Sequence, residues 1–214
     1  MCRFRPFCAV LFLYFAGWAS ASPIFYDVTV DTSSITGTAG SLDFNFNPGP
    51  LVTQAASLQI LNFTSDGALA GDCPCGTGDV SGQLPATLTF DNGSAFNDYF
   101  DDFTFGTTIS FDVSLLGAAL SSPDGVSTSG STFAFSMFSD LAGTIPVLTS
   151  DTTDGFAVTI GVNLDGTTTP TNFSSEATVT PVGTTSTPEP SSLLLLAAGL
   201  ATLIGVSRCQ KRAA

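Results

Sequence analysis

The stretch Ile109-Ser110-Phe111-Asp112-Val113-Ser114-Leu115 alternates apolar and polar side chains without interruption. Successive side chains of a β-strand point to opposite faces of the sheet, so this alternation predicts a strand with one buried and one solvated face. The same period recurs at these apolar positions: Val28 and Val30; Leu42, Phe44 and Phe46; Leu88 and Phe90; Phe133, Phe135 and Met137; Phe156, Val158, Ile160, Val162 and Leu164. We therefore expect a chain built from short, half-buried strands.

Turn-forming sequences separate these runs, among them Asp66-Gly67, Pro123-Asp124-Gly125 and Asp154-Gly155. Such sequences supply the positive or preset φ angles with which a chain reverses. Residues 55–63 are apolar on both faces and are expected to form a central strand, and residues 173–179 a last, weaker one. Together these features predict an all-β fold, an antiparallel β-sandwich of jelly-roll-like type, over residues 22–181.

The start of the chain has the three parts of a secretory signal peptide. Arg3 and Arg5 precede an apolar run, and Ala19-Ser20-Ala21 forms an A-x-A cleavage site. We expect residues 1–21 to form a signal helix in the precursor, to engage the secretion translocon and to be removed by signal peptidase. The exported domain then begins at residue 22.

The end of the chain combines a rigid motif, an apolar run and a basic cluster. Pro188-Glu189-Pro190 favours an extended peptide, because proline fixes its own φ and restricts the residue before it. Residues 191–207 are predicted to form a short transmembrane helix, and the basic residues after it place the C-terminus in the cytoplasm. Those basic residues are Arg208, Lys211 and Arg212. Residues 182–187, rich in Thr and Gly, are expected to be a flexible linker.

In this order and position, residues 187–212 resemble the PEP-CTERM sorting domain of Gram-negative bacteria. The resemblance implies that exosortase, a membrane enzyme, processes the exported protein near Pro188, Glu189 and Pro190. It also implies a precursor held transiently in the inner membrane by its C-terminus, and a mature protein at the cell surface or outside the cell. A plain single-pass anchor is the alternative interpretation of the same residues.

The distribution of charge limits what the exported domain can do. All five basic residues lie in the two terminal segments, the chain has no His, and the formal net charge is -13. The acidic residues other than Glu189 all lie in the exported domain, and all of these are Asp except Glu176. Without basic side chains the domain cannot contact phosphates electrostatically, so nucleic acid is excluded as a partner. Catalysis or zinc binding through His is excluded as well.

Two clusters remain as candidate sites. Cys73-Pro74-Cys75 is expected to form a disulfide after export, with an intermolecular link or free thiols as alternatives. Residues 97–102 are the densest acidic stretch, and Asp98, Asp101 and Asp102 are candidate ligands for calcium, which binds hard oxygens. A solvated loop is the alternative there. No other cofactor is expected.

The sequence therefore predicts a non-enzymatic exported protein of the cell surface or matrix, associated with exopolysaccharide in biofilms. One alternative is a carbohydrate-binding module, calcium-dependent or not, in which Tyr26 and Tyr99 would be the aromatic residues left to stack on sugars. The other is a secreted glycoside hydrolase that uses a pair of Asp residues.

Overall fold

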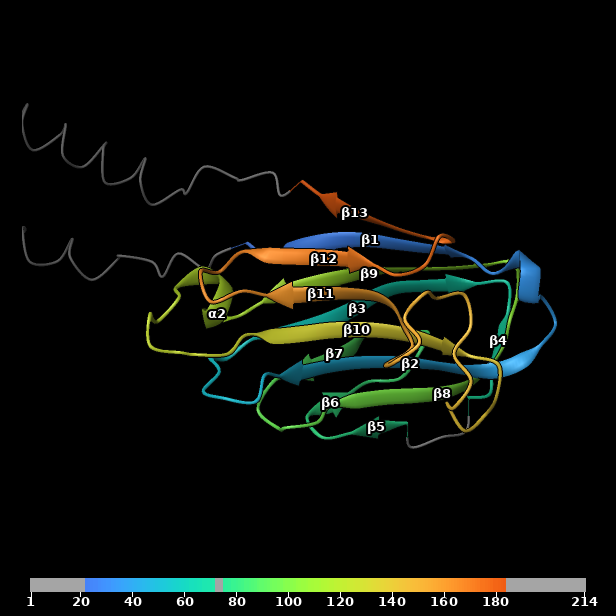
Figure 1. The fold of residues 1–214 in the computed structure, drawn as a ribbon, viewed down its shortest axis with the longest axis horizontal. Helices are drawn as coiled ribbons and strands as arrows, with labels where there is room; N and C mark the ends of the chain where they lie inside the picture. Colours follow the sequence, from blue (N-terminus) through green and yellow to red (C-terminus); the bar gives the residue numbers. More distant parts are fainter. Residues whose placement is uncertain (1–21, 72–74, 184–214) are drawn as a thin grey trace, which may run out of the picture. The chain divides into compact units, whose positions relative to one another are not determined.

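The alternating stretch at residues 109–115 lies within strand β9 (Thr108–Leu116), which is central to one of two sheets. The computed structural model describes residues 22–71 and 75–183 (Figure 1). The first sheet, which we call the β9 sheet, has the strand order β13 (Ala177–Val182), β1 (Ile24–Asp31), β9, β3 (Ser57–Ser65), β7 (Leu88–Asp91), β6 (Val80–Ser81).

The second sheet, which we call the β2 sheet, contains seven strands. Its order is β12 (Thr168–Asn172), β11 (Phe156–Val162), β10 (Ser131–Phe138), β2 (Ala39–Pro48), β8 (Asp98–Thr104), β4 (Ala68–Leu69), and β5 (Gly76–Thr77) also pairs with β8. The described helices are a 3-10 turn, η2 (Ser33–Ile35), and a single-turn helix, α2 (Ala118–Ser121).

All pairings between these strands are antiparallel, which confirms the all-β prediction. The predicted signal helix and C-terminal transmembrane helix lie outside the described residues. Within residues 22–71 and 75–183, no helix has the length and apolar character needed to cross a bilayer.

Phenylalanine rings join the two sheets. Phe44 of β2 meets Phe111 of β9 at a ring-centroid distance of 5.2 Å, and Phe135 of β10 meets Phe111 at 5.1 Å. All three side chains are almost completely buried. Each buried Phe contributes about 1.5–3 kcal/mol of transfer free energy, so the aromatic core stabilises the domain where ion pairs cannot form.

The last strands differ from their prediction. Residues 173–179 do not form one strand, because β12 ends at Asn172 and a turn follows in which the Ser174 N–H donates to Asn172 Oδ1 at 3.0 Å. The final strand, β13, extends to Val182, which pairs with Phe25 of β1. Val182 is therefore part of the sheet and not of the predicted linker.

The remaining strand predictions differ in detail. Strand β3 begins at Ser57 and lies between β9 and β7, so the central position expected for residues 55–63 is confirmed. Leu164 was expected in the core, but β11 ends at Val162 and Leu164 is 51% exposed in the following turn. Phe156 was also expected to face the core. A bulge between β10 and β11 pairs it with Ser136 instead and turns it to the outer face of the β2 sheet.

The segment between β10 and β11, residues 139–155, folds back over the outer face of the β2 sheet (Figure 1). Ser41 Oγ donates to the carbonyl of Asp140 at 3.0 Å, and the rings of Phe100 and Phe138 lie 6.5 Å apart. Gly40 permits this approach, because a Cβ there would lie 2.0 Å from the Phe138 carbonyl oxygen. This segment borders the outer-face site described next.

Candidate functional site

A groove with a volume of about 460 Å³ lies on the outer face of the β2 sheet. It is lined by Asn45, Asn47, Pro48, Gly49, Phe96, Thr132, Ala134, Asp154 and Phe156. Strands β2, β10 and β11 supply its floor, and the segment before β8 supplies Phe96, whose side chain is 54% exposed. The groove therefore combines amide, hydroxyl and carboxylate groups with two phenylalanine rings.

The alternation of β2 places the amides in this groove. Leu42, Phe44 and Phe46 are completely buried between the sheets, so the residues between them must face outward. Asn45 pairs across the ladder with Ala134 of β10, which also lines the groove. The polar positions of β2 thus follow from the same period that predicts its core.

Asp43, Asn45 and Asp98 form a cluster beside the groove, which we call the carboxyl–amide cluster. Asn45 Nδ2 donates to Asp43 Oδ1 at 2.7 Å, and Asn45 lies directly opposite Asp98 of β8. The carboxyl of Asp98 lies close enough to that of Asp43 to raise its pKa. The amide of Asn45 therefore lies between two carboxyls that face the same side of the sheet.

The environment of Asp43 favours its protonated form. Burial raises the pKa of Asp43 from 3.8 to about 9, and the hydrogen bond to Asp98 and the charge of Asp98 act in the same direction. The bond from Asn45 opposes them. The raised pKa favours the neutral carboxyl of Asp43, which lowers the repulsion between two adjacent carboxyls.

Two oxygens of the cluster have no hydrogen-bond partner among the described residues: Asn45 Oδ1 and Asp98 Oδ1. Both atoms are buried, and the Asn45 side chain as a whole is only 9% exposed. A buried polar atom without a partner costs about 1–3 kcal/mol, so such atoms in a folded protein mark places where a ligand, ion or water completes the bonding.

The predicted calcium ligands do not come together. Residues 98–104 form strand β8 and not a loop, so their side chains alternate between two faces. Asp101 points into the core and is 1% exposed, whereas Asp98 and Asp102 face outward. Among residues 22–71 and 75–183, no group of three Cys, Asp or Glu side chains is placed to hold a metal. The combination of Asp98, Asp101 and Asp102 was therefore wrong, and only Asp98 belongs to the cluster.

The two tyrosines are structural. Tyr26 is 4% exposed, and its hydroxyl is hydrogen-bonded to Thr168 Oγ1 at 2.7 Å. Tyr99 is 1% exposed and is bonded to Leu84 and Asp101. Neither ring is available to stack on a sugar. The aromatic side chains that line the groove are Phe96 and Phe156 instead.

Cys75 is buried against the core and is disulfide-bonded. Cys73 lies outside the described residues, so its pairing with Cys75 stays a prediction.

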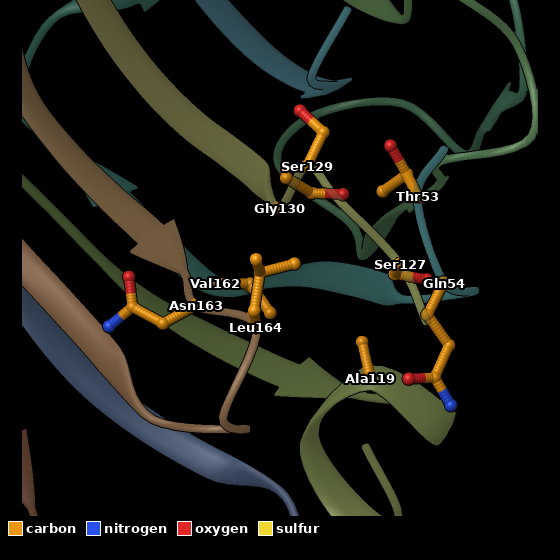
Figure 2. Close-up of a pocket in the computed structure, with 10 residues that line it drawn as sticks. Thr53, Gln54, Ala119, Ser127, Ser129, Gly130, Val162, Asn163 and Leu164 are labelled. Atoms are coloured by element: carbon orange, nitrogen blue, oxygen red, sulfur yellow. The ribbon is translucent and has the colours of Figure 1, made fainter. Parts of the chain in front are cut away.

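Two other cavities are weaker candidates. The first lies where Gln54, Ala119, Asn163 and Leu164 meet (Figure 2). Its volume is about 10 Å³, which is no more than one water molecule needs. The second is an open depression of about 560 Å³ lined by residues 148–150 and 172–176. Neither contains a buried polar side-chain atom without a partner among the described residues, in contrast to the carboxyl–amide cluster.

Four residues of this site were not predicted from the sequence: Asp43, Asn45, Phe96 and Phe156. The alternation of β2 contained a signal for the first two, since its outward positions are acidic and amide residues. The local sequence does not indicate that Asp98 lies beside them, because that contact depends on the pairing of β2 with β8. Phe156 reaches the groove through the bulge, which sequence periodicity does not reveal.

The sorting residues lie outside the described residues. These are Ala19 and Ala21 of the cleavage site, Pro188, Glu189 and Pro190, and Arg208, Lys211 and Arg212. In comparison with known proteins, residues 186–212 match the family model of the PEP-CTERM protein-sorting motif. No curated protein and no solved structure matches the chain. The motif implies an exported protein that exosortase sorts and that carries a C-terminal membrane-anchoring signal.

Proposed function

We propose that this chain is a non-enzymatic protein of the cell surface or extracellular matrix that associates with exopolysaccharide in biofilms. The match of residues 186–212 to the sorting motif carries the proposal, because it assigns the protein to a route that ends outside the cell. An acidic domain without basic side chains suits that destination, since like-charged copies repel one another and remain soluble.

The proposed route has four steps. The translocon exports the chain, and signal peptidase cleaves after Ala21. The helix at residues 191–207 then holds the precursor in the inner membrane, with Arg208, Lys211 and Arg212 on the cytoplasmic side. Exosortase finally processes the chain near Pro188-Glu189-Pro190, which releases the β-domain from its anchor.

The groove on the β2 sheet supports association with a polysaccharide. Asn47 and Thr132, which line the groove and are not buried, offer hydrogen-bonding groups of the kind that recognise sugar hydroxyls. Phe96 and Phe156 offer apolar rings for the faces of sugar units. Binding in this groove corresponds to the carbohydrate-binding module predicted from the sequence as an alternative, with phenylalanines in the place of tyrosines.

The carboxyl geometry supports a binding protein over a glycoside hydrolase. The carboxyls of Asp43 and Asp98 interact so closely that Asp98 raises the pKa of Asp43. Retaining glycosidases hold their two carboxyls about 5–5.5 Å apart and inverting enzymes about 6.5–9.5 Å apart, with the substrate or a water between them. A pair in direct contact leaves no such space.

The route is tested by replacing Pro188-Glu189-Pro190 with three alanines in a Gram-negative host that carries exosortase. We expect the wild-type chain to lose its tail and to leave the membrane fraction, and the variant to remain there at precursor size. The two forms are separated by membrane fractionation and their masses are measured. Equal processing of both proteins would refute the assignment.

The polysaccharide association is tested separately, by co-sedimentation of the protein with exopolysaccharide from the same host. Phe96→Ala and Phe156→Ala should each weaken binding by about two- to tenfold, because stacking on an aromatic ring contributes about 0.5–1.5 kcal/mol beyond the apolar area it buries. The matched control is Leu141→Ala, which removes an exposed apolar side chain that does not line the groove. Unchanged binding by both Phe variants would remove the groove from the proposal.

A further inference from the structure

We propose that Asp43, Asn45 and Asp98 form a binding site for a divalent cation that prefers hard oxygen ligands, with Ca²⁺ as the expected ion. The site is distinct from the predicted combination of Asp98, Asp101 and Asp102. It goes beyond the proposed function, because it requires neither exosortase nor a polysaccharide.

The cluster brings oxygen atoms together on a rigid platform. Asp43 and Asn45 are two residues apart on β2, so their side chains lie on the same face of the sheet. Asp98 lies directly across from Asn45 on the neighbouring strand. Side chains opposite each other on paired strands have Cβ atoms about 4.5–5.5 Å apart, which is a distance that one cation can bridge.

The domain has no basic side chain that could compensate two adjacent carboxylates. No Lys, Arg or His occurs between Arg5 and Arg208. A doubly charged ion bound beside Asp43 and Asp98 would compensate both carboxylates.

The atoms without partners indicate what is bound. Asn45 Oδ1 and Asp98 Oδ1 are both buried and both lack a hydrogen-bond donor among the described residues. One proton held by Asp43 cannot satisfy both of these oxygens, whereas a cation bound between Asn45 and Asp98 coordinates both of them. Amide and carboxylate oxygens are the ligands that Ca²⁺ takes, at about 2.3–2.6 Å.

A fourth oxygen lies nearby. Ser136 of β10 is paired with Asp43 across the ladder and is 1% exposed. Ca²⁺ takes about 6–8 oxygen ligands in a flexible geometry, and water completes the shell of partly open sites. Mg²⁺ requires a near-ideal octahedron at about 2.0–2.1 Å and releases water reluctantly, so a site on one face of a sheet favours Ca²⁺.

The other sheet supplies a matched comparison. Asp27 and Asp112 lie opposite each other on β1 and β9, and Asn62 Nδ2 donates to Asp112 Oδ2 at 2.6 Å. This set has the same composition, but Asp27 and Asn62 are exposed, and none of its side chains has a buried oxygen without a partner. It is a solvated surface pair, so Asp27→Asn serves as a control for the loss of one charge.

The test uses the full-length chain in detergent, treated with EDTA and dialysed into about 150 mM NaCl, which screens exposed charges beyond about 8 Å. Isothermal titration with CaCl₂ should show one site with a Kd of about 10⁻⁴–10⁻³ M, the range of extracellular calcium modules. At about 10 mM CaCl₂ the Tm should rise by about 3–10 °C, and MgCl₂ should produce a smaller rise.

Asp98→Asn should weaken Ca²⁺ binding about tenfold or more and abolish the rise in Tm. In EDTA the same variant should be at least as stable as the wild type, because it no longer places two carboxyls together. If Asp98 had a purely structural role, Asp98→Asn would be less stable than the wild type both with CaCl₂ and in EDTA. Asp27→Asn should bind Ca²⁺ like the wild type.

The proposal is overturned if the wild type binds no Ca²⁺, if Asp98→Asn binds it as well as the wild type, or if Asp27→Asn removes the binding. Should Asp98→Asn fail to fold, Ca²⁺ binding is measured with Asp43→Asn instead, since this variant removes a ligand from the other strand. Retained binding by that variant overturns the proposal, and loss of binding supports it. The replacement of Pro188-Glu189-Pro190 tests the sorting route independently of whether the domain binds Ca²⁺.

Discussion

The hydroxyl of Tyr99 donates a hydrogen bond of 3.1 Å to Oδ2 of Asp101, two residues further along β8, and both side chains point into the core. The same hydroxyl accepts the N–H of Leu84 at 3.1 Å. Burial raises the pKa of Asp101, and it raises the pKa of Tyr99 from 10.0 to about 12. In a domain without basic side chains, a phenol thus provides a hydrogen bond to an internal carboxyl.

Tyr99→Phe should lower the free energy of unfolding by about 1–3 kcal/mol, because the buried N–H of Leu84 loses its acceptor. Urea denaturation followed by circular dichroism measures the change. Tyr26→Phe is the matched control, since among the described residues its hydroxyl is hydrogen-bonded to the partly buried Thr168 alone. That control should cost about 0.5–1.5 kcal/mol, and an equal or larger loss in the control would contradict the role given to Tyr99.

Asp66 should contribute stability that is lost in acid. Its carboxylate accepts bonds from Thr107 Oγ1 at 2.7 Å, from the Thr108 N–H at 3.1 Å and from the Thr107 N–H at 2.7 Å, and these bonds lower its pKa below 3.8. A lowered pKa means that the contribution is complete above the unfolded value and disappears as the pH falls through the folded value.

Asp66→Asn should therefore have a lower Tm than the wild type near pH 6, and the difference should shrink towards pH 2. Thermal unfolding over that range measures it. Asp154→Asn removes a charge from a loop carboxyl to which no described residue donates a hydrogen bond, so its Tm difference should not follow this course. A constant difference for Asp66→Asn would disprove the electrostatic explanation.

Phe44→Ala should destabilise the domain by about 3–5 kcal/mol, because it opens a cavity at the centre of the sandwich. The ring of Phe44 lies 4.8 Å from that of Phe135 and 5.2 Å from that of Phe111. Phe96→Ala, at an exposed position, should change stability by no more than about 0.5 kcal/mol. Similar losses in both variants, measured by urea denaturation, would mean that the core is not centred on Phe44.

Gly40→Ala should cost at least about 1–3 kcal/mol, because the new methyl group would lie 2.0 Å from the Phe138 carbonyl oxygen and 2.7 Å from the Phe105 ring. The expected consequence is detachment of residues 139–155, which should appear as faster amide hydrogen exchange there. Gly161→Ala is the control in the same sheet, since its new Cβ meets nothing closer than 3.9 Å. Unchanged exchange in Gly40→Ala would show that this segment does not depend on the close approach.

The class of the fold could be predicted from the sequence because the two-residue period depends only on neighbouring residues of one strand. The runs around Phe111, Phe44 and Phe133 all became strands whose apolar side faces the core. The acidic residues at 98–102 were consistent with a solvated loop, but they lie in strand β8. There Tyr99 and Phe103 face the core, and the pairing of β8 with β2 stabilises a strand that can accommodate the buried Asp101.

The sequence by itself determined the strand period, the absence of basic side chains from the exported domain and the sorting motif at residues 186–212. Only the tertiary structure decided that Asp98 lies beside Asp43 and Asn45 and that Phe156 lines the groove. The reason is physical. Composition and period are carried by neighbouring residues, whereas strand register and a bulge depend on contacts between segments far apart in the chain, and a shift of one residue would turn every side chain to the other face.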